Sequence, residues 1–162
     1  IRRQLCLLQA ASYVRWFTKK SATDATFQID SLAASDEPVE SADVVFASLK
    51  SIRSLDQGET GATQNAMQAQ QLQAVTKLRR FLDTAAENEA VWRRALAQTL
   101  LRTATSAHDW KFPFALFEEA TRVAPAYRSR VLAMTAFAAP GSDAPDSVGY
   151  TTATAALSAF SG

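Results

Sequence analysis

The apolar residues of this chain recur every three or four positions through most of its length, which is the spacing of one face of an α-helix. Five successive segments between residues 41 and 139 show this spacing, and a weaker sixth follows at 150–160. The composition agrees, because Ala and Leu together number 47 whereas the strand-forming Val and Ile number 12. The sequence therefore predicts an all-α fold of about five to six helices. It argues against a sheet-based enzyme fold.

Capping and turn residues set the expected helix ends. Ser41 and Asn88 are candidate N-caps, and Pro113 is a favoured residue for a first helical turn. Pro125 and the Pro140-Gly141 pair stop the helices that precede them. The expected helices lie at 41–57, 64–86, 89–105, 113–124 and 126–139.

Charge is distributed unevenly along the chain. Residues 1–23 carry five basic residues and no acid, residues 24–62 have a net charge of −6, and the whole chain totals +1. A near-neutral total argues against a protein that coats nucleic acid, because such proteins are strongly basic. The asymmetry predicts three parts: a basic arm at 1–20, an acidic strap at 21–43 and a helical domain at 44–162.

The arm reads as an amphipathic helix with its bases at the two ends. An amphipathic segment that is rich in Arg and lacks acids is typical of mitochondrial targeting, so we expect a mitochondrial protein on the matrix side. The strap has no helical periodicity, and its isolated apolar residues would anchor it either on its own domain or on a neighbouring subunit. The residues expected to bind neighbours are Leu5, Leu8, Trp16, Phe27 and Ile29.

The chain resembles itself when it is shifted by 35 residues, so that 81–96 lies over 116–131. Ala85 then meets Ala120, and Trp92 meets Tyr127. Such a period is typical of stacked helical hairpins, in which a small residue allows close approach and an aromatic one fills the wedge. The alternative is a chance match between two amphipathic helix pairs.

The segment FALFEEATRVAPAYRSRVLAM (114–134) resembles the second half of a pentatricopeptide repeat and the start of the next. The resemblance covers roughly 64–160 and implies a short scaffold of helical hairpins. In that family such scaffolds read RNA bases through pairs of side chains or bind proteins. The layout is similar to that of the pentatricopeptide-like accessory subunit of some protist mitochondrial ATP synthases. It implies a non-catalytic accessory subunit of a large mitochondrial complex, with ATP synthase as the favoured host and other protein subunits as partners.

The second function that we consider is a mitochondrial RNA-associated or ribosomal protein. Four arginines flank the turn between the second and third expected helices and could form a basic ridge for RNA phosphates or for an acidic partner. The alternative is a solvated surface of salt bridges. The four residues are Arg79, Arg80, Arg93 and Arg94.

Three aromatic residues, Trp110, Phe112 and Phe114, fall in the turn expected between the third and fourth helices. They would either plug the end of a hairpin or anchor a partner, since Trp is enriched in interface hot spots.

Candidates for catalysis are few. One Cys and one His exclude a disulfide framework and a zinc site of several Cys or His ligands. His108 beside Asp109 would either orient a general base or cap a turn. We therefore expect no enzyme activity, cofactor or metal. No charge-free run approaches the ~20 apolar residues that span a bilayer, although contact with a membrane surface stays open.

Overall fold

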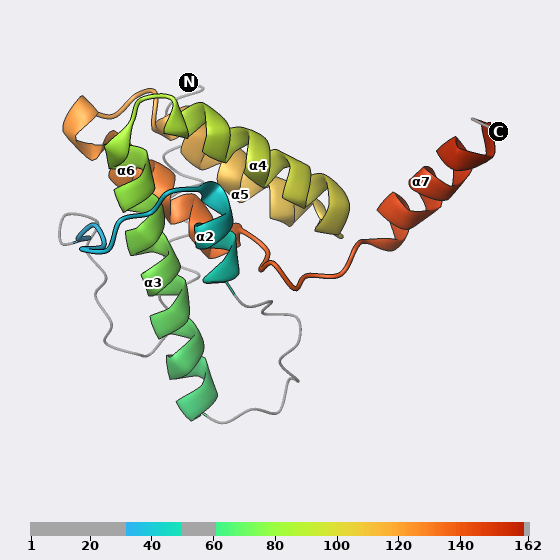
Figure 1. Ribbon diagram of the computed structural model, residues 1–162, viewed down its shortest axis with the longest axis horizontal. Coiled ribbons are helices and arrows are strands. Elements are labelled where there is room, and N and C mark those ends of the chain that lie inside the picture. Colours follow the sequence, from blue (N-terminus) through green and yellow to red (C-terminus); the bar gives the residue numbers. More distant parts are fainter. Residues whose placement is uncertain (1–31, 50–60, 161–162) are drawn as a thin grey trace, which may run out of the picture.

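The computed structural model describes residues 32–49 and 61–160, and every regular element in these ranges is a helix (Figure 1). The prediction of an all-α fold is confirmed. The arm at 1–20 lies outside the described residues, as do Leu5, Leu8, Trp16, Phe27 and Ile29. The elements are α2 (Ala42–Ala47), α3 (Gly61–Thr84), α4 (Asn88–Thr103), α5 (Ala107–Glu119), α6 (Pro125–Ala133), the 3-10 helix η3 (Met134–Ala138) and α7 (Val148–Phe160).

Helix α3 is the centre of the fold. Its 24 residues span ~36 Å. Val75, Leu78 and Phe81 are buried at helical spacing along its C-terminal half. This face packs against α6 and η3, which come some fifty residues later in the chain, and α2 also packs on α3 (Figure 1). The chain thus closes back on itself around α3.

Trp92 of α4 is fully buried and joins three elements. Its ring stacks on Phe46 of α2 with centroids 4.9 Å apart. Its Nε1 donates to Thr135 Oγ1 in η3 at 2.8 Å, and that hydroxyl donates to the carbonyl of Leu132 at 2.6 Å. The one polar atom of the indole is therefore satisfied inside an apolar core.

The described part of the strap packs on its own domain. Leu32 and Val39 are buried in the same core as α3, and the amide of Ser35 donates to the carbonyl of Thr76 at 3.0 Å. The strap was predicted to be anchored either on its own domain or on a neighbouring subunit. Residues 32–41 are anchored on their own domain.

Helix α2 is shorter than predicted. It begins after Ser41, as expected, but it ends at Ala47. The amide of Leu49 bonds to the carbonyl of Phe46, three residues back, so the backbone has already left the α-helical pattern. Leu49 is nevertheless buried, so its side chain still contributes to the core.

Helix α5 begins six residues before the predicted start at Pro113, so that prediction is wrong. Asp109 Oδ2 accepts from the amides of Ser106 and Thr105 at 3.0 and 2.8 Å and thereby fixes a helix start at Ala107. Pro113 lies inside the helix with its ring buried, and this burial offsets the lost backbone hydrogen bond. Trp110, Phe112 and Phe114 are consequently helical residues, and the predicted aromatic turn is wrong.

The two halves of the predicted repeat differ at the aromatic position. Trp92 is fully buried, whereas 41% of Tyr127 is exposed, with Arg130 stacked over its ring at 5.4 Å. Tyr127 therefore does not fill a wedge as predicted. Ala120 is buried and Ala85 is half-buried.

Helix α7 projects from the body at the end of an extended linker (Figure 1). Its closest packing is on α4. Within the described ranges, no helix combines the length and apolar character that crossing a bilayer requires.

Candidate partner-binding surfaces

An aromatic ladder runs along one flank of α5. We use this name for Trp110, Phe114, Phe117 and Arg93. The ring of Phe114 lies 6.1 Å from Trp110 and 6.1 Å from Phe117, the second pair edge to face. The guanidinium of Arg93 lies over the Phe117 ring at 4.4 Å. Because Phe114 is 52% exposed, the middle of the ladder is open to a partner.

Phe112 lies elsewhere. Two residues along an α-helix correspond to a rotation of about 200°, so Phe112 and Phe114 leave α5 on opposite flanks. Phe112 is also exposed, at 46%. Of the three aromatic residues predicted to form one anchor, the structure brings together Trp110 and Phe114 and separates Phe112.

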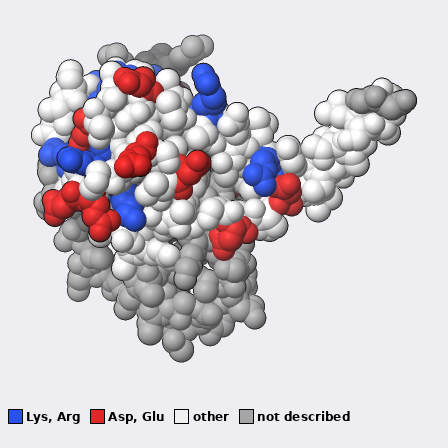
Figure 2. Space-filling view, in the orientation of Figure 1, with Lys and Arg blue, Asp and Glu red and all other residues white. Residues whose placement is uncertain are grey.

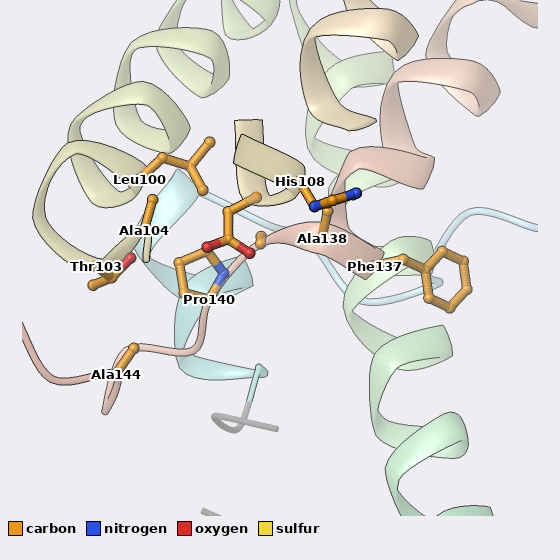
Figure 3. Close-up of a pocket in the computed structure, with 10 residues that line it drawn as sticks. Leu100, Thr103, Ala104, His108, Phe137, Ala138, Pro140 and Ala144 are labelled. Carbon is orange, nitrogen blue, oxygen red and sulfur yellow. The ribbon is translucent and has the colours of Figure 1, made fainter. Parts of the chain in front are cut away.

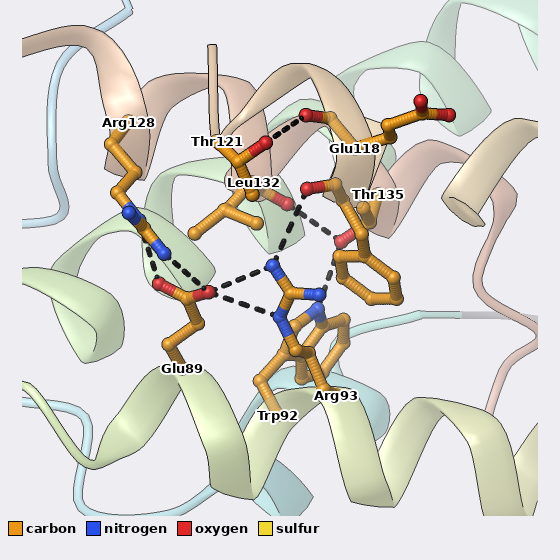
Figure 4. Close-up of polar contacts among 9 residues, drawn as sticks. Glu89, Trp92, Arg93, Glu118, Thr121, Arg128, Leu132 and Thr135 are labelled. Atoms are coloured by element: carbon orange, nitrogen blue, oxygen red, sulfur yellow. Dashed lines mark hydrogen bonds and ion pairs between the residues drawn. The ribbon is translucent and has the colours of Figure 1, made fainter. Parts of the chain in front are cut away.

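An ion cluster borders the ladder and joins α4 to α6 (Figure 4). Glu89 accepts from Arg128 Nε and Nη2 at 2.9 and 3.0 Å and from Arg93 Nε at 3.0 Å. Hydrogen bonding to Arg128 is the main cause that lowers the pKa of Glu89, and Arg93 acts in the same direction against partial burial. The same pairing raises the pKa of Arg128. The cluster gives the ladder a charged border of the kind that surrounds many interface cores.

The predicted basic ridge is partly neutralised within the chain. Arg79 lies 3.4 Å from Asp83, with only 18% of its side chain exposed, and Arg93 is bound to Glu89 and stacked on Phe117. Arg80 and Arg94 are exposed. Figure 2 shows acidic and basic side chains interspersed over the visible body.

The pocket beside His108 has a volume of about 300 Å³ and a mainly apolar lining (Figure 3). Leu100 and Thr103 of α4 and the adjacent Ala104 lie on one side of it, and Ala138 lies near His108. The Thr103 hydroxyl donates to the carbonyl of Thr99, and the Asp109 carboxylate accepts from the two amides at the start of α5. Of the two roles that the sequence left open for His108 and Asp109, Asp109 therefore has the capping role. Among the described residues, no three His, Cys, Asp or Glu side chains gather as a metal site.

Residues 139–160 form a second surface, which we call the C-terminal arm. Residues 147–160 contain no Asp, Glu, Lys or Arg, and no residue of α7 is buried. In Figure 2 the projecting part of the molecule is accordingly free of blue and red beyond its root. At this root Arg102 Nε and Nη2 donate to Asp146 Oδ1 at 2.9 and 2.7 Å.

Sequence reasoning missed the ladder and the exposure of α7. The signal for the ladder was present, since Trp110, Phe114 and Phe117 follow helical spacing once Ser106 and Asp109 are taken as the helix start. The ion pair between Glu89 of α4 and Arg128 of α6 had no such signal in the sequence, because the two residues are 39 positions apart.

Comparison of the chain with protein-family models, with curated proteins and with solved structures finds no match.

Proposed function

We propose that this chain is a non-catalytic structural subunit that binds neighbouring proteins of a larger assembly through the aromatic ladder. The observation that carries the proposal is the half-exposed Phe114, held between Trp110 and Phe117 with Arg93 at the end of the row. Trp and Arg are the residue types most enriched in interface hot spots, and Phe is also enriched at interfaces. The Glu89 cluster beside the ladder supplies a polar border.

The host that we propose is a mitochondrial complex, with ATP synthase as the specific candidate. The basic, acid-free arm and the pentatricopeptide-like layout support this host. RNA binding through the arginines is the competing function. It receives less support, because Arg79 and Arg93 already hold acidic partners in the same chain.

The test is a pull-down of the tagged full-length chain from mitochondria, before and after ribonuclease, with mass spectrometry of the bound proteins. We expect ATP synthase subunits in both samples. Phe114→Lys should weaken their recovery by at least about tenfold, because it places a charge in the middle of the ladder. Phe112→Lys is the matched control, since it makes the same change in the same helix at similar exposure on the opposite flank.

Three results would contradict the proposal. Loss of the partners after ribonuclease, or recovery of ribosomal proteins, would favour the RNA function. Equal recovery with Phe114→Lys and Phe112→Lys would show that the ladder is not the binding surface. Recovery of another respiratory assembly would refute the ATP synthase host and retain the structural role.

A further inference from the structure

The root of helix α7 is attached to the C-terminal end of α4. Arg102 donates through Nε and Nη2 to Asp146 Oδ1, at 2.9 and 2.7 Å. The amide of Ser147 donates to the carbonyl of the same Arg102 at 2.6 Å. Tyr150, in the first turn of α7, lies in a groove that Leu101 and Arg102 also line. Each of these contacts involves Arg102 or the groove beside it.

Beyond Tyr150, α7 adds little to this attachment. No residue of the helix is buried, and Leu157 and Phe160 are 66% and 90% exposed. The helix leaves the body as it continues from its root (Figure 1). In the part of the chain that the structure describes, the direction of α7 is therefore set at its root rather than along its length.

The linker before α7 is held against the body as far as residue 142. Ala139 and Gly141 are buried, and the amide of Ser142 donates to the carbonyl of Phe46 at 3.3 Å. Pro145 then fixes its own φ and restricts the backbone of the residue before it. Little rotation is consequently left in the linker before Asp146.

Helix α7 itself begins as a rigid unit at Ser147. The Ser147 hydroxyl accepts from the amide of Tyr150 at 3.3 Å, as an N-cap does, and the Ser147 carbonyl accepts from the amide of Thr151 at 3.0 Å. Rotation of α7 relative to the body therefore falls mainly at Asp146 and its two neighbours in the chain. Arg102 holds two of these three residues.

The ion pair at this hinge is exposed and therefore weak. The side chains of Arg102 and Asp146 are 53% and 33% exposed. A pair of such exposure shifts an equilibrium about fivefold at most, and salt screens it. An attachment made of one such pair and one backbone hydrogen bond leaves an open state populated on the order of 1–10%.

We propose that Arg102 and Asp146 form a latch, and that α7 turns about residues 145–147 when this latch opens. With the latch closed, α7 keeps the direction seen in Figure 1. With the latch open, the helix samples other directions while the body stays folded, because the buried residues all precede the hinge. Salt opens the latch by screening the pair. This inference does not rest on the proposed function, because it does not involve the aromatic ladder.

The test is the distribution of distances between two spin labels, measured by pulsed electron paramagnetic resonance on the full-length chain. In a Cys6→Ser background, which removes the one native thiol, the labels are attached at Ala90→Cys in α4 and Ala155→Cys in α7. Both alanines are exposed. We expect one narrow main distance at low salt. Asp146→Lys should at least about double the width of the distribution, because it places two like charges at the latch.

Two further variants separate the latch from a general effect of charge. Arg102→Glu combined with Asp146→Lys recreates the pair with the opposite polarity and should restore the narrow distribution. Glu118→Lys is the matched control, since it breaks an exposed ion pair with Arg122 at a distance from α7 along the chain and should leave the distribution unchanged. Raising NaCl from about 0.05 M to about 1 M should broaden the distribution of the parent chain and change that of Asp146→Lys much less.

Three results would each overturn the proposal. A distribution that stays narrow in Asp146→Lys would show that another part of the chain holds α7. A broad distribution in the parent chain at low salt would show that the ion pair does not hold the helix in one direction. A double variant that stays as broad as Asp146→Lys would show that the substitution disturbs the linker rather than the pair.

Discussion

At the scale of single residues, the contact between Trp92 and Thr135 decides how the core is assembled. An indole N–H needs an acceptor when it is buried, and here the acceptor comes from a residue 43 positions later. This bond places α4 against η3 in one specific register. The hydroxyl of Thr135 is itself fixed by the carbonyl of Leu132, so the acceptor is already oriented.

Replacement of Thr135 by Val should lower the free energy of unfolding by about 1–3 kcal/mol, because the buried Trp92 N–H loses its acceptor. The measurement is urea unfolding followed by circular dichroism. Thr99→Val is the control, since the Thr99 hydroxyl donates only to the carbonyl of Ala95 within its own helix. A loss no larger than that of Thr99→Val would refute the importance of the contact.

At the scale of the elements, the Glu89 carboxylate ties α4 to α6 through Arg128. Its lowered pKa means that the folded state favours the ionised form more than the unfolded state does. The resulting stabilisation is therefore fully present above the ordinary pKa of 4.5, and it is lost as the pH falls through the lower pKa of the folded state.

Glu89→Gln should lower the free energy of unfolding by about 1 kcal/mol at pH 7, because the amide keeps the shape of the carboxylate and loses the charge. The difference from the parent chain should shrink as the pH falls from 4.5 toward the lower pKa of the folded state, because the unfolded parent chain takes up its proton before the folded one does. Thermal unfolding at several pH values measures this. Glu40→Gln, at an exposed position of the strap, serves as the control. A difference that stays constant down to pH 3 would show that the charge has no part in the link.

The element boundaries also show what the sequence could and could not predict. The approximate positions of α3, α4 and α6 followed from apolar spacing, since this signal is local. The predicted cap at Asn88 is wrong, because Asn88 is the first residue of α4 and its side chain donates to the carbonyl of Phe81. The helix predicted at 126–139 ends at Ala133, where the 3-10 helix η3 follows. The start of α5 was missed because Pro113 suggested a first turn, while the cap at Ser106 and Asp109 stood one turn earlier than the apolar run. The early end of α2 had no such signal, because Leu49 continues the apolar spacing and is buried although it lies outside the helix.

At the scale of the whole molecule, the body and the C-terminal arm are separate contributors to stability. Among the described residues, the buried ones all lie at or before Gly141, whereas α7 holds none. The sequence predicted the sixth helix but not that it would stand apart, because its apolar residues look like those of any core helix. Burial depends on how the helices pack in three dimensions. The 35-residue self-similarity likewise gave no indication that α3 would contact α6 and η3.

Removal of residues 148–160 should therefore leave the free energy of unfolding of the monomer unchanged within about 0.5 kcal/mol. The measurement is urea unfolding at protein concentrations where the full chain is monomeric. Leu96→Ala is the contrasting change, because Leu96 is fully buried and its truncation should cost about 2–5 kcal/mol. A comparable loss on removal of α7 would show that the arm is part of the core.

The packing of α3 against α6 and η3 has a consequence for synthesis on the ribosome. In an array of stacked repeats, each unit can fold once its nearest neighbour has been made. Here the apolar face of α3 emerges early and then waits for partners that end at Ala138. During that interval the native cover of Val75, Leu78 and Phe81 is incomplete, because α2 is already made but α6 and η3 are not. The nascent chain is therefore exposed to aggregation and to chaperones until η3 has left the exit tunnel.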